Sequence, residues 1–156
     1  MEPFFDLPAV ASGRPVTDTE RTAWLADGES TAEGEPVSVL CNFTADLGPP
    51  YLVRAEIRIG SLEGAQTIFS LNGFIEPGVE YMGFLGFSMT APELGDTYEG
   101  GGESCVFATI EGDAVARSFW GKLTCTSVQG LETAGTCALG ASFMAFENCS
   151  VIPQGG

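Results

Sequence analysis

Five cysteines are the residues of this chain with the clearest capacity for chemistry, and their spacing favours disulfides over metal binding. No pair has the two-residue spacing typical of structural zinc sites, and the chain contains no histidine that could complete one. Disulfides predict an oxidising compartment. Because the cysteine count is odd, one thiol is left free or available for an intermolecular bond.

The expected hairpin register of the C-terminal third predicts one disulfide. A turn centred on Gly112–Asp113 and a loop centred on Leu131 place Cys125 directly opposite Cys137. Facing residues of an antiparallel pair lie within the Cα separation that a disulfide requires. We therefore expect a Cys125–Cys137 bridge.

The same register constrains the remaining cysteines. It separates Cys105 from Cys149 along the strands by a length on the order of 23 Å, so these two are not expected to bond to each other. Cys41 is expected to pair with either Cys105 or Cys149, and the sequence leaves both pairings open.

Carboxylates are the second group with chemical capacity. The chain has 21 Asp and Glu against 6 Lys and Arg, a formal net charge of -15. Hard oxygen donors favour calcium, which is the one cofactor that we consider, although the spacing is not that of an EF-hand. A solvated acidic loop is the alternative. The main candidate ligands lie in the glycine-rich stretch 91–103, and they are Glu93, Asp96, Glu99 and Glu103. The other candidates are Glu111 and Asp113 at the predicted turn.

Catalysis is not expected from these residues. The absence of histidine excludes every triad or dyad that uses imidazole as its base. The chain has no nucleophile elbow, phosphate-binding loop or dinucleotide fingerprint. A carboxylate pair that hydrolyses glycosides remains the enzymatic alternative, because it needs no sequence signature.

Period-two alternation of apolar residues identifies the elements that position these groups, and it predicts an all-β fold. Short strands with frequent turn signals indicate an antiparallel β-sandwich, or a barrel-like sheet, of about seven to eight strands. We expect a single β-domain over 36–153, with the dipeptide Asn72–Gly73 forming a hairpin turn. The expected strands cover 37–44, 51–59, 65–71, 81–89, 104–110, 114–128 and 136–147.

Residues 1–35 instead predict an irregular N-terminal arm with one short helix as an alternative. Thr17 to Glu20 fits a capping box, and Gly28 is placed to end a helix. Trp24 and Leu25 would be its apolar anchors.

The predicted register also sorts the C-terminal strands into a core face and a second face that mixes aromatic and small polar residues. Aromatic side chains in such a setting favour docking of a glycan, a peptide or a partner protein. The alternative is that the N-terminal arm covers this face through Trp24 and Leu25, or through Phe4 and Phe5. The residues expected on this face are Phe107, Ser118, Trp120, Ser142, Met144 and Phe146.

The charge balance bounds the partners. The negative charge of the protein repels nucleic acid and anionic membranes. The sequence contains no run of 18 apolar residues, so no membrane-spanning helix is expected. The expected disulfides predict an exported or cell-surface protein. Because the segment from Met1 to Phe4 has neither the basic nor the apolar region of a leader, we expect that its leader was removed.

These observations together predict a non-catalytic binding or assembly domain. The alternative is a structural subunit of a homo-oligomer or filament, joined to neighbouring copies by edge strands or by the odd cysteine.

Overall fold

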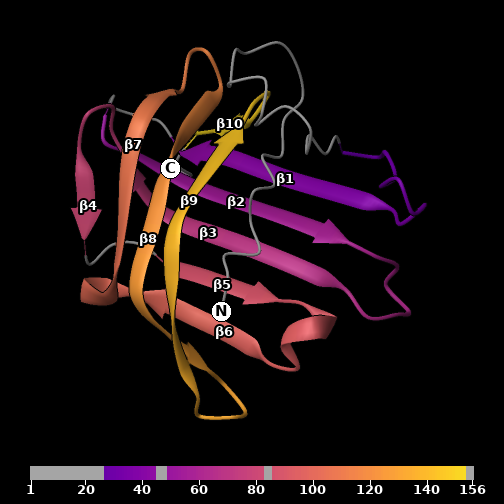
Figure 1. Ribbon diagram of the computed structural model, residues 1–156. Helices are drawn as coiled ribbons and strands as arrows, with labels where there is room; N and C mark the ends of the chain where they lie inside the picture. The colour runs from indigo at the N-terminus through magenta and orange to yellow at the C-terminus, as the bar shows by residue number, and fades with distance from the viewer. Residues whose placement is uncertain (1–26, 45–48, 83–85, 154–156) are drawn as a thin grey trace.

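The computed structural model describes residues 27–44, 49–82 and 86–153 (Figure 1). The predicted helix over residues 17–28 lies almost wholly outside these ranges. So do Phe4, Phe5, Trp24 and Leu25, so the predicted covering by the arm is not tested. Within the described ranges, no helix has the length and apolar character needed to cross a membrane.

The predicted all-β fold is confirmed, and β-strands account for nearly all of the regular structure. Two short 3-10 turns, η2 (Pro92–Leu94) and η3 (Gly102–Ser104), flank one of the strands. In chain order the strands are β1 (Val37–Thr44), β2 (Tyr51–Ile59), β3 (Thr67–Ile75), β4 (Glu80–Met82), β5 (Gly86–Thr90), β6 (Thr97–Gly101), β7 (Cys105–Asp113), β8 (Ser118–Gly130), β9 (Thr136–Phe146) and β10 (Ser150–Ile152).

The strands form one hydrogen-bonded sheet that curls over on itself. Its order is β10-β1-β2-β3-β5-β6-β8-β7-β4, and β9 pairs with the other edge of β8. In Figure 1, β1, β2, β3, β5 and β6 form a back layer, and β4, β7, β8 and β9 cross in front of it. Strand β8 joins the two layers, because its first half pairs with β7 and its last residues pair with β6. The pairing is antiparallel except between β1 and β10.

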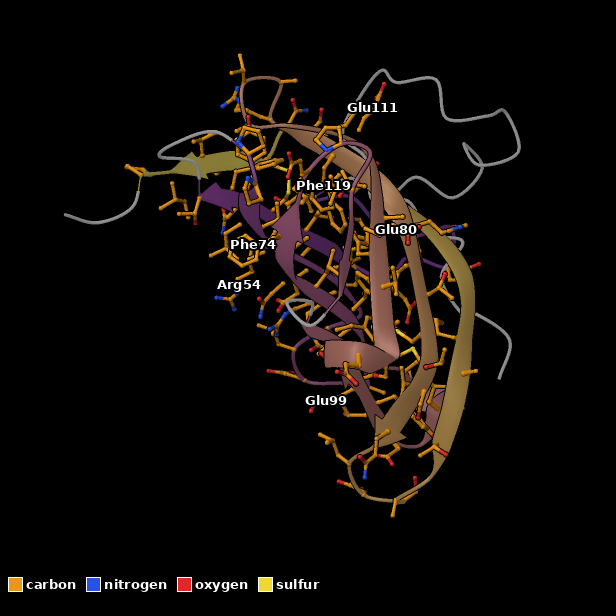
Figure 2. All side chains as sticks on the ribbon, turned by 90° about the vertical axis from the view of Figure 1, so that its left-hand side faces the viewer. Arg54, Phe74, Glu80, Glu99, Glu111 and Phe119 are labelled. Atoms are coloured by element: carbon orange, nitrogen blue, oxygen red, sulfur yellow. A yellow bond between two sulfur atoms is a disulfide. The ribbon has the colours of Figure 1, made fainter. Side chains whose placement is uncertain are left out.

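The hydrophobic core fills the space between the two layers, and Phe119 lies at its centre (Figure 2). The Phe119 ring stacks on Phe146 of β9 with centroids 5.2 Å apart. It also makes edge contacts with Phe43 of the back layer at 5.9 Å and with Phe107 of β7 at 6.1 Å. Because these rings come from four strands of both layers, their burial holds the layers together.

The turn predicted at Asn72–Gly73 is wrong. Strand β3 runs through both residues, which pair with Arg54 and Val53 of β2 in an uninterrupted register. The chain reverses instead after Glu76, where the Val79 amide donates to the Glu76 carbonyl at 3.1 Å. A favoured turn dipeptide is a local preference, and here the long ladder with β2 outweighs it.

The turn predicted at Gly112–Asp113 is also wrong, because β7 extends through Asp113. The reversal occurs over residues 114–117, where Arg117 adopts a left-handed conformation with φ 55°. Asp113 pairs with Ser118, and the register places Cys105 opposite Cys125. This register differs from the expected one by an odd number of residues along most of the hairpin.

The expected strand 81–89 is divided, and part of the expected acidic loop is a strand. Strands β4 and β5 pair with different neighbours, β7 and β3. Strand β6 lies within the stretch 91–103 and pairs with β5 and β8.

Candidate functional site

The two disulfides differ from the predicted set. Cys105 bonds to Cys125 with a Cα separation of 4.1 Å, and Cys41 bonds to Cys149 with a Cα separation of 4.6 Å. The predicted Cys125–Cys137 bridge is wrong, because Cys137 faces Val128 and not Cys125 across the ladder. The pairing of Cys41 with Cys149 is one of the two options that the sequence left open.

The fifth cysteine, Cys137, is in neither disulfide. It is partly buried against the core, and burial raises the pKa of its thiol. A raised pKa reduces the thiolate fraction, which is the reactive form.

The predicted aromatic docking face is not formed by the residues that can be placed. Phe107 and Phe146 are 0% and 1% exposed, and Ser118 is also buried. The physical reason is the register, since a one-residue slip moves a strand's side chains to the opposite face. The backbones of Trp120, Ser142 and Met144 pair within the β8–β9 ladder, and their side chains lie outside the described part of the chain.

The predicted calcium ligands do not form a metal site among the described side chains. No three acidic, histidine or cysteine side chains in that part of the chain converge as a metal-binding group. Glu99 and Glu103 are exposed, whereas Asp96 is buried. The side chain of Glu93 lies outside the described residues.

Asp96 is a structural anchor in which both carboxylate oxygens accept hydrogen bonds from the protein. Oδ2 accepts from the amide of Thr133 at 2.9 Å and from its hydroxyl at 2.6 Å. Oδ1 accepts from the amides of Thr97 at 2.7 Å and of Glu132 at 3.1 Å. These bonds, above all those from Thr133, lower the pKa of Asp96 from 3.8 to about 2. A carboxylate of this kind stays ionised and is unsuited to act as a general acid.

The ladder breaks open at the corner where the chain passes from β6 to β7. Between the pairs Glu99–Gln129 and Cys105–Cys125, no residue of 100–104 is paired with β8, although Gly100 and Gly101 still pair with β5. Glycines make this corner possible. Gly102 has φ 57°, and a Cβ on Gly100 would lie 2.7 Å from the Cys105 sulfur. Gly100 is therefore closely packed at this corner, whereas a Cβ on the exposed Gly102 would meet nothing within 4 Å.

A depression of about 490 Å³ lies at this break, and we call it the β6 groove. Side chains with hydrogen-bonding groups dominate its walls, and Leu131 supplies an apolar rim. The Ser104 hydroxyl donates to the Gly101 carbonyl at 2.8 Å, so it is held in place by the corner itself. The residues that define the groove are Glu99, Gly101, Ser104, Ser127, Gln129 and Leu131.

A polar surface leads from the groove across the outer side of the back layer. Glu99 faces Ser88 on β5, and Ser88 faces Ser70 on β3, with their hydroxyls 2.7 Å apart. Figure 2 shows Arg54 and Phe74 farther along the outer side of this layer, away from Phe119 in the core. A second depression of about 310 Å³ borders Thr97, next to Asp96 and Glu132.

The β6 groove can form hydrogen bonds, and its Ser104 hydroxyl is bonded to the corner that carries it. Within the described residues, the Ser104 hydroxyl donates to the Gly101 carbonyl at 2.8 Å and to the Cys105 sulfur at 4.0 Å, and neither acceptor is a base. The sequence analysis missed Ser104, Ser127 and Gln129 as site residues. The available signal was the glycine run directly before Cys105, which marks a close approach of backbone to a buried group.

No protein-family model, curated protein or solved structure matches this chain.

Proposed function

We propose that the protein is a non-catalytic, exported binding domain whose contact site is the β6 groove. The observation that carries the proposal is the break in the ladder at residues 100–104. It leaves a depression of about 490 Å³ walled by hydroxyl, amide and carboxylate groups. Ligand sites are concave and place a few polar groups to fix the orientation of the ligand.

Two contacts support a preformed site. The Cys105–Cys125 disulfide lies under Gly100, and Asp96 fastens the loop that carries Leu131. Rigid walls lower the entropy that binding would otherwise lose. The same disulfides support export, since such bonds persist mainly in oxidising compartments.

The chemistry of the walls favours a ligand rich in hydroxyl groups, such as a neutral glycan. Ser127, Gln129 and Glu99 together offer both donors and acceptors, which matches the alternating groups of a sugar. The net charge of -15 disfavours an anionic ligand. Leu131 is the one large apolar residue that lines the groove, so an apolar group of a ligand would find little apolar surface to contact.

A titration by nuclear magnetic resonance tests the proposal. Neutral oligosaccharides added up to about 10 mM should shift amides of residues 99–104 and 127–131, with the millimolar affinity of a small polar site. Gln129→Ala should weaken binding about tenfold, because it removes the two donors and the acceptor of an exposed side chain in the groove wall. Glu80→Gln is the matched control, since Glu80 is an exposed acid on β4 in the other layer.

The readouts separate the candidate functions. Amide shifts with no release of reducing ends support a binding domain, whereas hydrolysis of the oligosaccharide would support a carboxylate-pair glycosidase. No shift in the groove with any neutral oligosaccharide would reject the proposed site.

A further inference from the structure

Among the described strands, the curled sheet ends at β4, β9 and β10, and the edge of β9 differs from the other two. Strands β4 and β10 each have 3 residues, whereas β9 has 11. One side of β9 pairs with β8 from Phe119 to Gln129. Within residues 27–44, 49–82 and 86–153, no strand pairs with its other side. Figure 1 shows β9 at the margin of the front layer.

The composition of β9 would allow this edge to pair with another chain and aggregate if nothing covers it. Residues 136–146 include no charged residue and no proline. In an antiparallel pair, alternate residues direct their amide and carbonyl groups away from the partner strand. Natural proteins protect such edges with charges, proline, short strands or a covering segment. Strand β9 has none of the first three, and the two register irregularities of its ladder with β8 are the one protection that the described residues show. A covering segment would complete the protection of this edge.

We propose that the N-terminal segment, residues 1–26, lies along the free edge of β9 and covers it within the same molecule. This segment ends where the chain joins the sheet. The Gly28 amide donates to the Val37 carbonyl at 3.0 Å, and the Val39 amide donates to Asp27 Oδ1 at 2.9 Å. An extended chain spans about 3.3 Å per residue, so the segment is long enough to reach either layer.

The sequence of the segment suits this role. Residues 16–26 form a stretch of 11 residues without proline, equal in length to β9, so no position in it lacks the amide that a ladder needs. The stretch ends with the apolar side chains of Trp24 and Leu25. These can bury surface against the front layer while the backbone pairs with β9.

Charge favours this occupant over a second copy of the chain. Two copies would bring together net charges of -15 each, which repel one another. The segment contains four acidic and two basic residues, so it carries little of that charge. A tethered segment also acts at an effective concentration in the millimolar range for short links, which an untethered copy rarely reaches.

Hydrogen exchange on the full chain tests the proposal. The β9 amides that do not bond to β8 should be protected, and the protection should not change with protein concentration. The double variant Trp24→Asp with Leu25→Asp should reduce their protection by about tenfold or more, because the covering segment opens locally. The β2 amides should stay protected and so report an intact fold. Leu62→Asp is the matched control, because Leu62 is 86% exposed in the β2–β3 connection.

Three outcomes would overturn the proposal. Rapid exchange of these amides in the unaltered chain means that the edge is open. Protection that rises with protein concentration identifies a second copy as the occupant. Full protection in a chain that begins at Asp27, with β2 also protected, shows that residues 1–26 do not cover β9. The protein itself supplies the ligand in this test, so failure here leaves the glycan proposal unaffected.

Discussion

Thr133 donates both its backbone amide and its hydroxyl to the same carboxylate oxygen of Asp96, at 2.9 and 2.6 Å, although the two residues are 37 positions apart. A third contact, from the Leu131 amide to the Thr97 carbonyl at 2.9 Å, reinforces the link. These bonds hold the β8–β9 loop against the start of β6. They therefore position Leu131 at the rim of the β6 groove.

Asp96→Asn should destabilise the fold in a pH-dependent manner. The folded-state pKa of Asp96 is lowered to about 2 from 3.8, so its contribution is present above about pH 4. This stabilising contribution is lost as the pH falls from about 4 to about 2, because protonation removes the negative charge of the carboxylate that accepts the hydrogen bonds. Urea unfolding of the unaltered chain and the variant should show a difference in stability that narrows between about pH 4 and about pH 2.

Two controls refine the Asp96 experiment. Thr133→Val removes one of the donors to Asp96 and should reproduce part of the effect. Glu33→Gln alters an exposed acid in the turn before β1 and should produce no such narrowing. A constant difference between Asp96→Asn and the unaltered chain across the whole pH range would contradict the anchor role.

The two disulfides should contribute unequally to stability. Cys41 and Cys149 are 108 residues apart in sequence, whereas Cys105 and Cys125 are 20 apart. The chain-entropy model then predicts that the longer loop stabilises by about 1.5 kcal/mol more. Guanidinium unfolding of Cys41→Ala with Cys149→Ala, compared with Cys105→Ala with Cys125→Ala, measures the difference. A larger loss from the second pair would show that local packing at the β6 corner outweighs loop entropy.

Phe107→Ala should act on folding and not on binding. The ring is fully buried and contacts Phe119, so its removal should cost about 3–5 kcal/mol of unfolding free energy. Leu62→Ala is the control, and this exposed residue should change stability by less than about 0.5 kcal/mol. Denaturant unfolding checks both variants. A Phe107→Ala variant of unchanged stability would be incompatible with the observed packing.

Gly100→Ala should destabilise the corner beneath the β6 groove by about 1–3 kcal/mol, because the new methyl overpacks the site. Its Cβ would lie 2.7 Å from the Cys105 sulfur and 2.9 Å from Cγ1 of Val128. Gly86→Ala on β5 is the matched control. Its nearest neighbour would be the side-chain amide of the exposed Asn72 at 3.3 Å, which can move. Equal melting temperatures for the two variants would argue against a tightly packed corner.

The sequence alone determined those features that depend on alternation within one strand. The bounds of β1 and β2 match the expected strands 37–44 and 51–59. Their core residues, including Phe43, Val53 and Ile57, are those that the period-two pattern places on one face. The all-β class followed for the same reason, because a strand pattern repeats along most of the chain.

Only the tertiary structure decided which strands meet and in what register. Nothing local distinguishes a reversal at Gly112–Asp113 from one at residues 114–117, yet the choice decides the partner of Cys105 and the face that carries Phe107. The groove has the same origin, since Ser104 and Ser127 approach each other only because the ladder breaks between β6 and β7. Such contacts join residues far apart in sequence. Their energies depend on packing across the whole core, which no short window of sequence contains.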